Sequence, residues 1–93
     1  MLFSVETTSR FDREYKKLFK KHTELPQYFA EVINILSFDP HNITHLHAIK
    51  KLKDVKDGDG QYRLRLWRFR FRYDIVEKKV ILKYCGLRRE DTY

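Results

Sequence analysis

The spacing of apolar residues divides the chain into a helical first part and a strand-rich second part. A first helix is predicted by apolar residues at i, i+4, i+7 and i+8, which share one helical face. These residues are Phe11, Tyr15, Leu18 and Phe19. Ser9 is the predicted N-cap of this helix, with Asp12 three residues further on.

A second helix is predicted to begin at Glu24-Leu25-Pro26, since proline is tolerated in a first helical turn, and to end at Asp39-Pro40. Its inward side is formed by apolar residues spaced three and four apart. They are Leu25, Phe29, Val32, Ile33 and Leu36. Two short amphipathic helices with a brief link predict a helical hairpin that covers a flat surface.

Strands are predicted where apolar and polar residues alternate. The predicted strands are residues 2–7, 61–66, 69–76 and 80–85. A basic connector, residues 41–60, precedes the last three strands and ends in the turn signal Asp57-Gly58-Asp59-Gly60. The order β-α-α-β-β-β predicts an α+β fold, with an N-terminal helical hairpin packed on one face of a mainly antiparallel four-stranded sheet.

Residues 62–73 alternate arginine with aromatic residues or leucine for nearly their whole length. Successive side chains of a strand point to opposite faces, so one face is apolar and the other is a row of guanidiniums. A hairpin turning at Trp67-Arg68 pairs the apolar residues as Leu66 with Phe69, Leu64 with Phe71 and Tyr62 with Tyr73. The opposite face then pairs Arg65 with Arg70 and Arg63 with Arg72.

Opposed like charges on a sheet cost about a few tenths to 1 kcal/mol per pair, so the fold gains nothing from this row. A solvated face neutralised by salt bridges is the plainer interpretation. Few acidic residues lie nearby in the sequence, however, and this favours a surface that binds phosphate groups. Two-residue hairpin turns require φ > 0 and normally use Gly, Asn or Asp. Trp67-Arg68 therefore predicts a wider loop, a bulge or backbone strain.

Length and charge narrow the class of protein. Ninety-three residues predict one domain, 1–93. Twenty Lys and Arg against 13 Asp and Glu leave a net charge of +7, which favours nucleic acid, an anionic membrane or an acidic partner. No apolar stretch approaches the roughly 20 residues of a membrane span, and the N-terminus does not resemble a signal peptide, so no membrane partner is expected. Cys85 is the only cysteine, which excludes an internal disulfide and favours the reducing cytoplasm.

Three motifs, in this order, resemble those of the RelE/ParE toxin superfamily. The family has a lysine-rich stretch before the sheet, an arginine-rich hairpin, and a last strand followed by arginines and a tyrosine. In this chain these are Lys50-Lys51-Leu52-Lys53, residues 62–73 and residues 86–93. The resemblance covers nearly the whole chain, including the order of the elements. The family's Gly-Asp turn is replaced by Trp67-Arg68, and the histidine common before its last arginine is absent.

The resemblance implies the toxin of a type II toxin–antitoxin system. RelE-type members are endoribonucleases that need no metal or cofactor and cut messenger RNA on the ribosome: the 2′-hydroxyl attacks the adjacent phosphate. The implied partners are an acidic antitoxin, mRNA and the ribosome. The oligomeric state stays open, between a monomer alone and a higher-order complex with the antitoxin. The alternatives are a non-catalytic toxin of the same fold, such as the ParE-type gyrase inhibitors, and a simple RNA-binding module.

Carried over position by position, the resemblance also implies site residues. The catalytic candidates are Arg65, Arg70, Arg88 and Tyr93, with Arg89 in place of Arg88 if one residue is inserted. The RNA-binding candidates are Lys50, Lys51, Lys53, Arg63, Arg68, Arg72 and Arg89. Arginine forks match phosphate oxygens, so they can neutralise the charge of the transition state. Tyr93 or a basic residue with a lowered pKa is the candidate base, and a frayed terminal residue is the plainer interpretation of Tyr93.

Other chemistry-bearing residues have plainer interpretations. His41, His45 and His47 lack the further ligands of a zinc site, which favours solvated loop histidines. Cys85 lies in an apolar strand and is predicted to be a buried structural thiol. Trp67 has three interpretations that the sequence does not separate: stacking on a base, contact with a partner, or a turn residue folded over the sheet edge.

Overall fold

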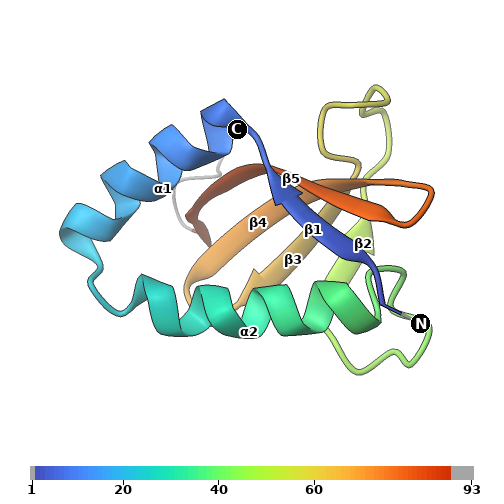
Figure 1. Cartoon of the computed structure of the whole chain (residues 1–93), viewed down its shortest axis with the longest axis horizontal. Coiled ribbons are helices and arrows are strands. Elements are labelled where there is room, and N and C mark those ends of the chain that lie inside the picture. The colour runs from blue at the N-terminus through green and yellow to red at the C-terminus, as the bar shows by residue number, and fades with distance from the viewer. Residues whose placement is uncertain (1, 89–93) are drawn as a thin grey trace.

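The computed structural model describes residues 2–88, and its sheet has five strands rather than the four predicted. The elements are β1 (Ser4–Thr7), α1 (Ser9–Lys21), α2 (Leu25–Phe38), β2 (Ile49–Lys51), β3 (Tyr62–Leu66), β4 (Phe69–Val76) and β5 (Lys79–Leu87). The strand order is β1-β5-β4-β3-β2 (Figure 1). All neighbouring strands are antiparallel except β1, which runs parallel to β5. The α+β class was predicted correctly.

The additional strand β2 lies within the segment predicted to be a basic connector. Its three residues pair with β3, and Ile49 lies opposite Leu64. Two of the three are lysines, so the segment lacks the apolar alternation that indicates a strand. Its position is set by the free edge of β3, which the sequence pattern alone does not reveal.

The first helix is capped one residue earlier than predicted. Thr8 has extended backbone angles, and its hydroxyl accepts a hydrogen bond from the amide of Phe11 at 3.1 Å, so Thr8 rather than Ser9 is the N-cap. Phe11 is buried as predicted, whereas Phe19 is 41% exposed and does not belong to the inward face. Tyr15 and Leu18 pack against the core as predicted, so the inward face of the helix is narrower than the sequence pattern indicated.

Both helices contribute to one core on the same face of the sheet. Phe11 of α1 and the α2 residues Leu25, Val32 and Leu36 are buried against β3, β4 and β5. Pro26 occupies the first turn of α2, and the amide of Asp39 donates to the carbonyl of Ile35 at its end, as the sequence predicted. The buried sheet residues of this core are Leu64, Phe69, Phe71, Tyr73, Val80, Leu82 and Cys85.

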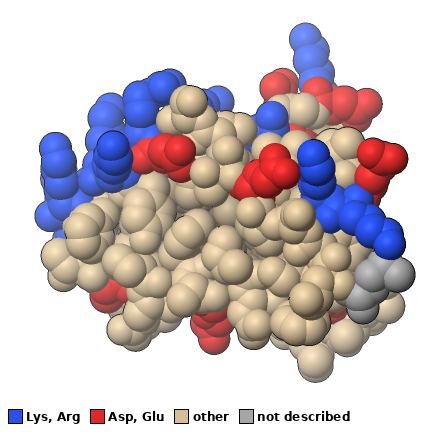
Figure 2. Space-filling model, in the orientation of Figure 1, with Lys and Arg blue, Asp and Glu red and all other residues tan. Residues whose placement is uncertain are grey.

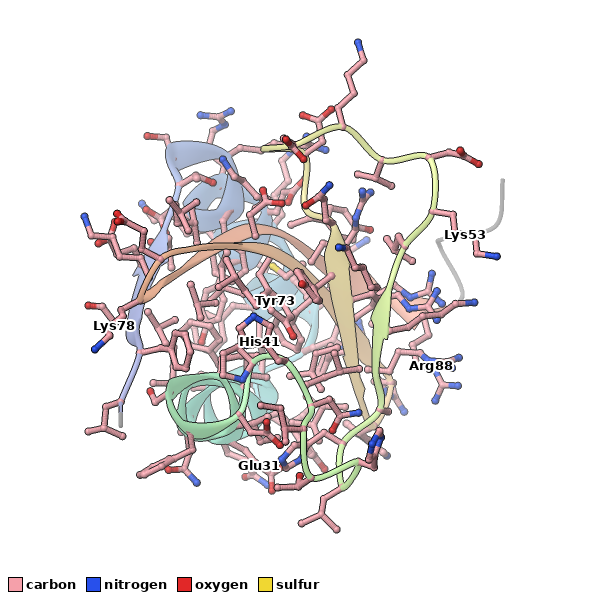
Figure 3. All side chains as sticks on the ribbon, turned by 90° about the vertical axis from the view of Figure 1, so that its right-hand side faces the viewer. Glu31, His41, Lys53, Tyr73, Lys78 and Arg88 are labelled. Atoms are coloured by element: carbon pink, nitrogen blue, oxygen red, sulfur yellow. The ribbon has the colours of Figure 1, made fainter. Side chains whose placement is uncertain are left out.

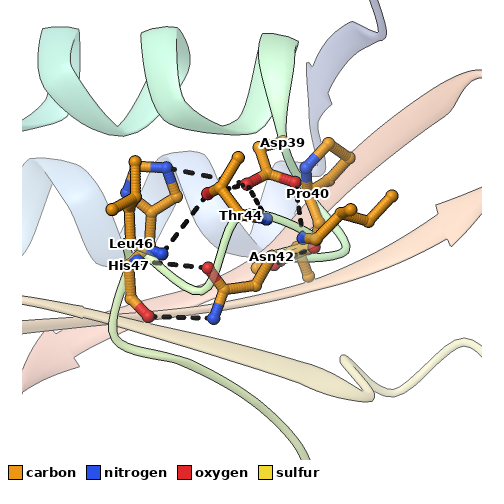
Figure 4. Close-up of polar contacts among 8 residues, drawn as sticks. Asp39, Pro40, Asn42, Thr44, Leu46 and His47 are labelled. Atoms are coloured by element: carbon orange, nitrogen blue, oxygen red, sulfur yellow. Dashed lines mark hydrogen bonds and ion pairs between the residues drawn. The ribbon is translucent and has the colours of Figure 1, made fainter.

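The loop after α2 is closed by the side chain of Asp39 (Figure 4). Its carboxylate accepts from the Thr44 hydroxyl at 2.6 Å and from the amides of Ile43 at 2.8 Å and Thr44 at 3.2 Å. The Thr44 hydroxyl bond is the main cause that lowers the pKa of Asp39, and the two amide bonds and nearby His47 act in the same direction. The buried Tyr73 hydroxyl also donates to the carbonyl of Pro40 at 2.7 Å, so this loop is fixed to the sheet.

Charge is unevenly spread over the surface. In Figure 2 one group of basic side chains lies over α1 and another at the opposite end of the molecule, whereas the surface over α2 is mostly uncharged. The basic residues of α1 are Arg10, Arg13, Lys16, Lys17, Lys20 and Lys21. Within residues 2–88, no helix has the length and apolar character that crossing a bilayer would need.

Candidate functional site

The face of the sheet turned away from the helices carries the row of arginines. Arg65 lies opposite Arg70 and Arg63 lies opposite Arg72 across β3 and β4, which is the predicted register. Lys50 of β2 lies opposite Arg63 and continues the row onto a third strand. Arg70 is only 8% exposed, whereas the other three arginines are half-buried. Basic groups therefore occupy one face of three adjacent strands.

A pocket of about 630 Å³ lies at the end of this row, beside the β3–β4 turn. Within residues 2–88, its lining consists of four arginines and one leucine: Arg65, Arg68, Arg70, Arg88 and Leu87. Figure 3 shows Arg88 on the side of the sheet opposite to α2, whereas Tyr73 lies on the α2 side. The three predicted catalytic arginines, Arg65, Arg70 and Arg88, thus line one pocket. None of its described lining residues is acidic, and guanidinium forks match the oxygens of a phosphate.

Arg88 is held at the pocket by the β3–β4 turn. Its amide donates to the carbonyl of Arg68 at 2.9 Å, and its Nη1 donates to the carbonyl of Trp67 at 3.0 Å. The end of β5 is thereby tied to the turn, although the two segments are far apart in the sequence. Arg89 and Tyr93, the other predicted site residues near the C-terminus, lie outside the described residues.

The turn itself has two residues, Trp67 and Arg68, so the predicted wider loop was wrong and the predicted strain is present. Trp67 has φ +57°, the left-handed region, which costs a non-glycine residue about 1–2 kcal/mol. Only the first turn residue has positive φ, as in a type II′ turn, where that position normally holds glycine.

The Trp67 ring packs on the helix side of the molecule. It stacks on Tyr28 of α2 at 4.8 Å between centroids, with 16° between the ring planes, and meets Phe69 edge-on at 5.8 Å. The guanidinium carbon of Arg68 lies over the Trp67 ring, 4.4 Å from its centroid. Of the three interpretations of Trp67, this arrangement supports the turn residue folded over the sheet edge.

Arg72 differs from the other arginines of the row because it holds a loop. Its Nε donates to the carbonyl of Gly60 at 3.1 Å, and its Nη2 donates to the carbonyl of Asp59 at 2.9 Å. The same loop is held by Asp74, whose carboxylate accepts from the amides of Gly60 and Gln61, both at 2.9 Å. Two arginines of the row, Arg65 and Arg70, therefore line the pocket, whereas Arg72 fixes the 52–61 loop.

The predicted RNA-binding lysines surround the row but do not line the pocket. Lys50 lies on the arginine face by register, whereas the Nζ of Lys51 lies 5.7 Å from the centroid of the Tyr62 ring. Lys53 follows β2 and is exposed, and Figure 3 shows it on the same side of the sheet as Arg88. These lysines can extend a basic surface beyond the pocket.

The histidines of the connector make contacts within the protein. His41 lies edge-on between Phe3 and Tyr62, at 5.9 and 6.1 Å between centroids. The Nε2 of His47 lies 3.9 Å from the Oδ2 of Asp39. Among residues 2–88, no group of three or more His, Cys, Asp or Glu is arranged to hold a metal ion.

Cys85 is a buried thiol, as predicted, with 3% of its surface exposed. Burial, together with the nearby Glu14 and Asp12, raises the pKa of the thiol to about 12. A thiol that stays protonated at neutral pH is a poor nucleophile. Its amide donates to Glu14 at 3.3 Å, so the residue belongs to the contact between α1 and β5.

Sequence reasoning missed two features near the pocket. Tyr28 was assigned no role, and no sequence signal links it to a turn so far along the chain. A second pocket of about 460 Å³ lies between α1 and β5, next to the first, with Leu87 in the lining of both. Lys17, Lys20 and Lys21 are among its lining residues, and the lysine-rich end of the first helix is a signal that points to it.

Comparison with solved structures finds the same fold in the crystal structure of the archaeal RelE–RelB complex from Pyrococcus horikoshii OT3. The match has a TM-score of 0.67 and 24% sequence identity, and it covers 95% of this chain and 97% of that chain. It shows that this chain has a RelE-type fold. No protein-family model matches the chain, and no curated protein matches it.

Proposed function

We propose that this protein is the toxin of a type II toxin–antitoxin pair and acts as an endoribonuclease of RelE type. The observation that carries the proposal is the pocket in which Arg65, Arg68, Arg70 and Arg88 converge on the arginine face of a RelE-type fold. Four cations in one pocket repel one another, and this arrangement is favourable only when a bound anion neutralises the charge. Messenger RNA supplies such an anion at every phosphate.

In the proposed reaction the 2′-hydroxyl of a nucleotide attacks the adjacent phosphate and forms a 2′,3′-cyclic phosphate. The bond from phosphorus to the 5′-oxygen breaks, and that oxygen takes up a proton from water. Arg65, Arg70 and Arg88 donate to the phosphate oxygens and neutralise the charge that grows on them, which is worth about 10²–10³ in rate for each well-placed donor. Tyr93 is our candidate for the group that takes the 2′-hydroxyl proton. Tyrosine titrates near about 10, and a guanidinium brought close to a tyrosine would favour the phenolate form. In this scheme the arginines supply the charge stabilisation, and no metal is required.

The scheme gives a reason for dependence on the ribosome. Arginine and tyrosine have pKa values far from 7, so most of the rate comes from charge and positioning rather than from a tuned acid–base pair. A free RNA chain rarely holds the in-line geometry that the attack needs. We therefore propose that the ribosome presents the messenger in that geometry and that free RNA is cut slowly.

The proposed partner that restrains the toxin is an acidic antitoxin. The solved structure with the same fold is a RelE–RelB complex. In the present chain, the net charge of +7 and the arginine pocket offer a surface that complements an acidic chain. An antitoxin that covers this surface would also deny it to RNA.

The proposal is tested by cleavage of mRNA with and without ribosomes, using Arg65→Ala, Arg70→Ala, Arg88→Ala and Tyr93→Phe variants. Each arginine variant is expected to lose about 10²–10³ of the rate. Arg13→Ala is the matched control, because it removes an exposed arginine from α1, away from the pocket. Circular dichroism checks that each variant is folded, and Arg70→Lys replaces Arg70→Ala if burial of this residue makes the alanine variant unstable.

Three outcomes would contradict parts of the proposal. Toxicity that survives all four substitutions in folded protein would exclude the ribonuclease and favour a non-catalytic toxin. RNA binding without cleavage, with a salt slope of roughly −0.7 per phosphate, would indicate a simple RNA-binding module. Equal rates on free and ribosome-bound RNA would exclude only the dependence on the ribosome.

A further inference from the structure

We infer that Trp67 is a positioning residue that acts on the bound RNA through Arg68. This inference rests on the proposed function and assigns a role to the residue by which this chain departs from the family's turn. Trp67 does not line the pocket, whereas its neighbour Arg68 does. The question is therefore what fixes the guanidinium of Arg68 at the pocket, given that Arg68 is itself exposed.

The Trp67 ring supplies that constraint. A guanidinium 4.4 Å from a tryptophan centroid is within the range of a favourable cation–π contact. The Tyr28 ring stacks on Trp67 at 4.8 Å, so the indole contacts both a tyrosine of α2 and the arginine of the turn. An exposed arginine has many rotamers, and the contact with a packed ring restricts Arg68, a residue that lines the pocket, to fewer of them.

The indole is itself firmly held. It stacks on Tyr28, meets Phe69 edge-on, and belongs to a turn whose carbonyl groups accept two hydrogen bonds from Arg88. Phe69 is fully buried in the core. Arg68 therefore contacts a ring that is itself packed against a core residue, and this restricts the position of its guanidinium. A glycine at this position keeps the backbone but provides no ring.

Substitutions at Trp67 distinguish the contribution of the indole ring from that of the turn backbone. Trp67→Gly adopts φ +57° without strain and keeps the carbonyl that binds Arg88, so only the ring is lost. Trp67→Phe keeps a ring for Arg68 and serves as the conservative variant. Relief of strain and loss of stacking oppose each other in Trp67→Gly, so we expect its melting temperature to stay close to that of the wild type.

Ribosome-dependent cleavage is measured for the wild type, Trp67→Gly, Trp67→Phe, Arg68→Ala and the double variant Trp67→Gly/Arg68→Ala. We expect Trp67→Gly to lower kcat/KM by about 10- to 100-fold, which is the range for a displaced positioning group, and Trp67→Phe to recover most of it. The double variant is expected to be no worse than Arg68→Ala, because both changes remove the same placed charge. Losses that multiply, or a Trp67→Gly variant as active as the wild type, would overturn the inference and leave the proposed function intact.

A binding measurement decides the inference even if the wild type does not cleave. The probe is a labelled 2′-O-methyl RNA, which has no free 2′-hydroxyl to attack, and its affinity is read by fluorescence anisotropy. Trp67 is the only tryptophan, so its emission also reports directly on the Arg68 contact. We expect the bound RNA to change this emission in the wild type but not in Arg68→Ala, and Trp67→Gly to weaken binding as much as Arg68→Ala does. Unchanged emission on binding, or unchanged affinity in Trp67→Gly, would overturn the inference. Absence of cleavage by the wild type would count against the proposed function alone.

Discussion

Replacing Asp74 by asparagine should remove the main support of the 52–61 loop without changing the size of the side chain. The carboxylate is 5% exposed, and its two oxygens accept from the amides of Gly60 and Gln61, each at 2.9 Å. Asparagine retains one acceptor oxygen, and its NH₂ group faces an amide that also donates. One buried N–H therefore loses its partner, and a charge-assisted bond becomes a neutral one.

These losses add to about 2–3 kcal/mol of unfolding free energy. For a domain of this length, 1 kcal/mol corresponds to roughly 4–8 °C, so the melting temperature should fall by about 8–24 °C. Thermal melts followed by circular dichroism, with urea titrations at 25 °C, measure both quantities. The matched control is Asp57→Asn in the same loop, whose carboxylate accepts only an exposed bond from Gln61 Nε2 at 2.8 Å. We expect the control to change stability by less than about 0.5 kcal/mol.

A double variant provides the sharper test. Arg72 donates to the carbonyls of Gly60 and Asp59, so Asp74 and Arg72 hold the same loop from the same strand. If either side chain is removed, the loop becomes less ordered, and the hydrogen bonds of the remaining side chain to the loop contribute less to stability. The losses of Asp74→Asn and Arg72→Ala should therefore sum to more than the loss of the double variant. An Asp74→Asn variant within about 0.5 kcal/mol of the wild type, or no different from Asp57→Asn, would refute the reasoning.

Three further outcomes follow from buried groups. Tyr73→Phe should lose about 1–3 kcal/mol in urea unfolding, because the buried carbonyl of Pro40 loses its donor; a loss near zero would contradict the role of that hydrogen bond. The pKa of Asp39 lies below its unfolded value of 3.8, so its contribution to stability is present above about pH 4 and is lost as the pH falls through the folded pKa. Thr44→Val should weaken this loss of stability in acid, measured as urea midpoints between pH 6 and 3. The same pH dependence in the variant and the wild type would refute the prediction. Cys85, with its pKa raised to about 12, should resist iodoacetamide at pH 8 in the folded protein and react once urea unfolds it; equal labelling rates would contradict its burial.

The features that the sequence predicted best are those set by residues adjacent in the chain, such as strand register and turn strain. The alternation of residues 62–73 gave the register of β3 and β4, including the pairing of Arg65 with Arg70, because side-chain direction in a strand follows from position alone. The poor turn residues at Trp67-Arg68 correctly indicated strain. The convergence of Arg65, Arg70 and Arg88 came from the family resemblance, and the structure brings these residues to one pocket.

What the sequence did not predict depends on residues far apart in the chain. Arg72, like Arg70, lies between two aromatic residues in the sequence, yet it holds a loop because Gly60 folds back beside it. The stacking of Tyr28 on Trp67 joins the second helix to the hairpin turn, and neither residue type by itself indicates the other. Strand β2 forms only because the edge of β3 is free, and its lysines give no periodic signal.

The parallel pairing of β1 with β5 has a consequence for the order in which the protein is made. Among the described residues, β1 precedes every other strand along the chain, and its partner, β5, follows them all. Such non-local pairing delays folding until both segments are available. Arg88 directly follows β5 and reaches the pocket through it. A nascent chain without residues 79–88 therefore has neither a partner for its first strand nor the last arginine of its pocket. The topology postpones assembly of the pocket until this segment has left the ribosome that is translating it.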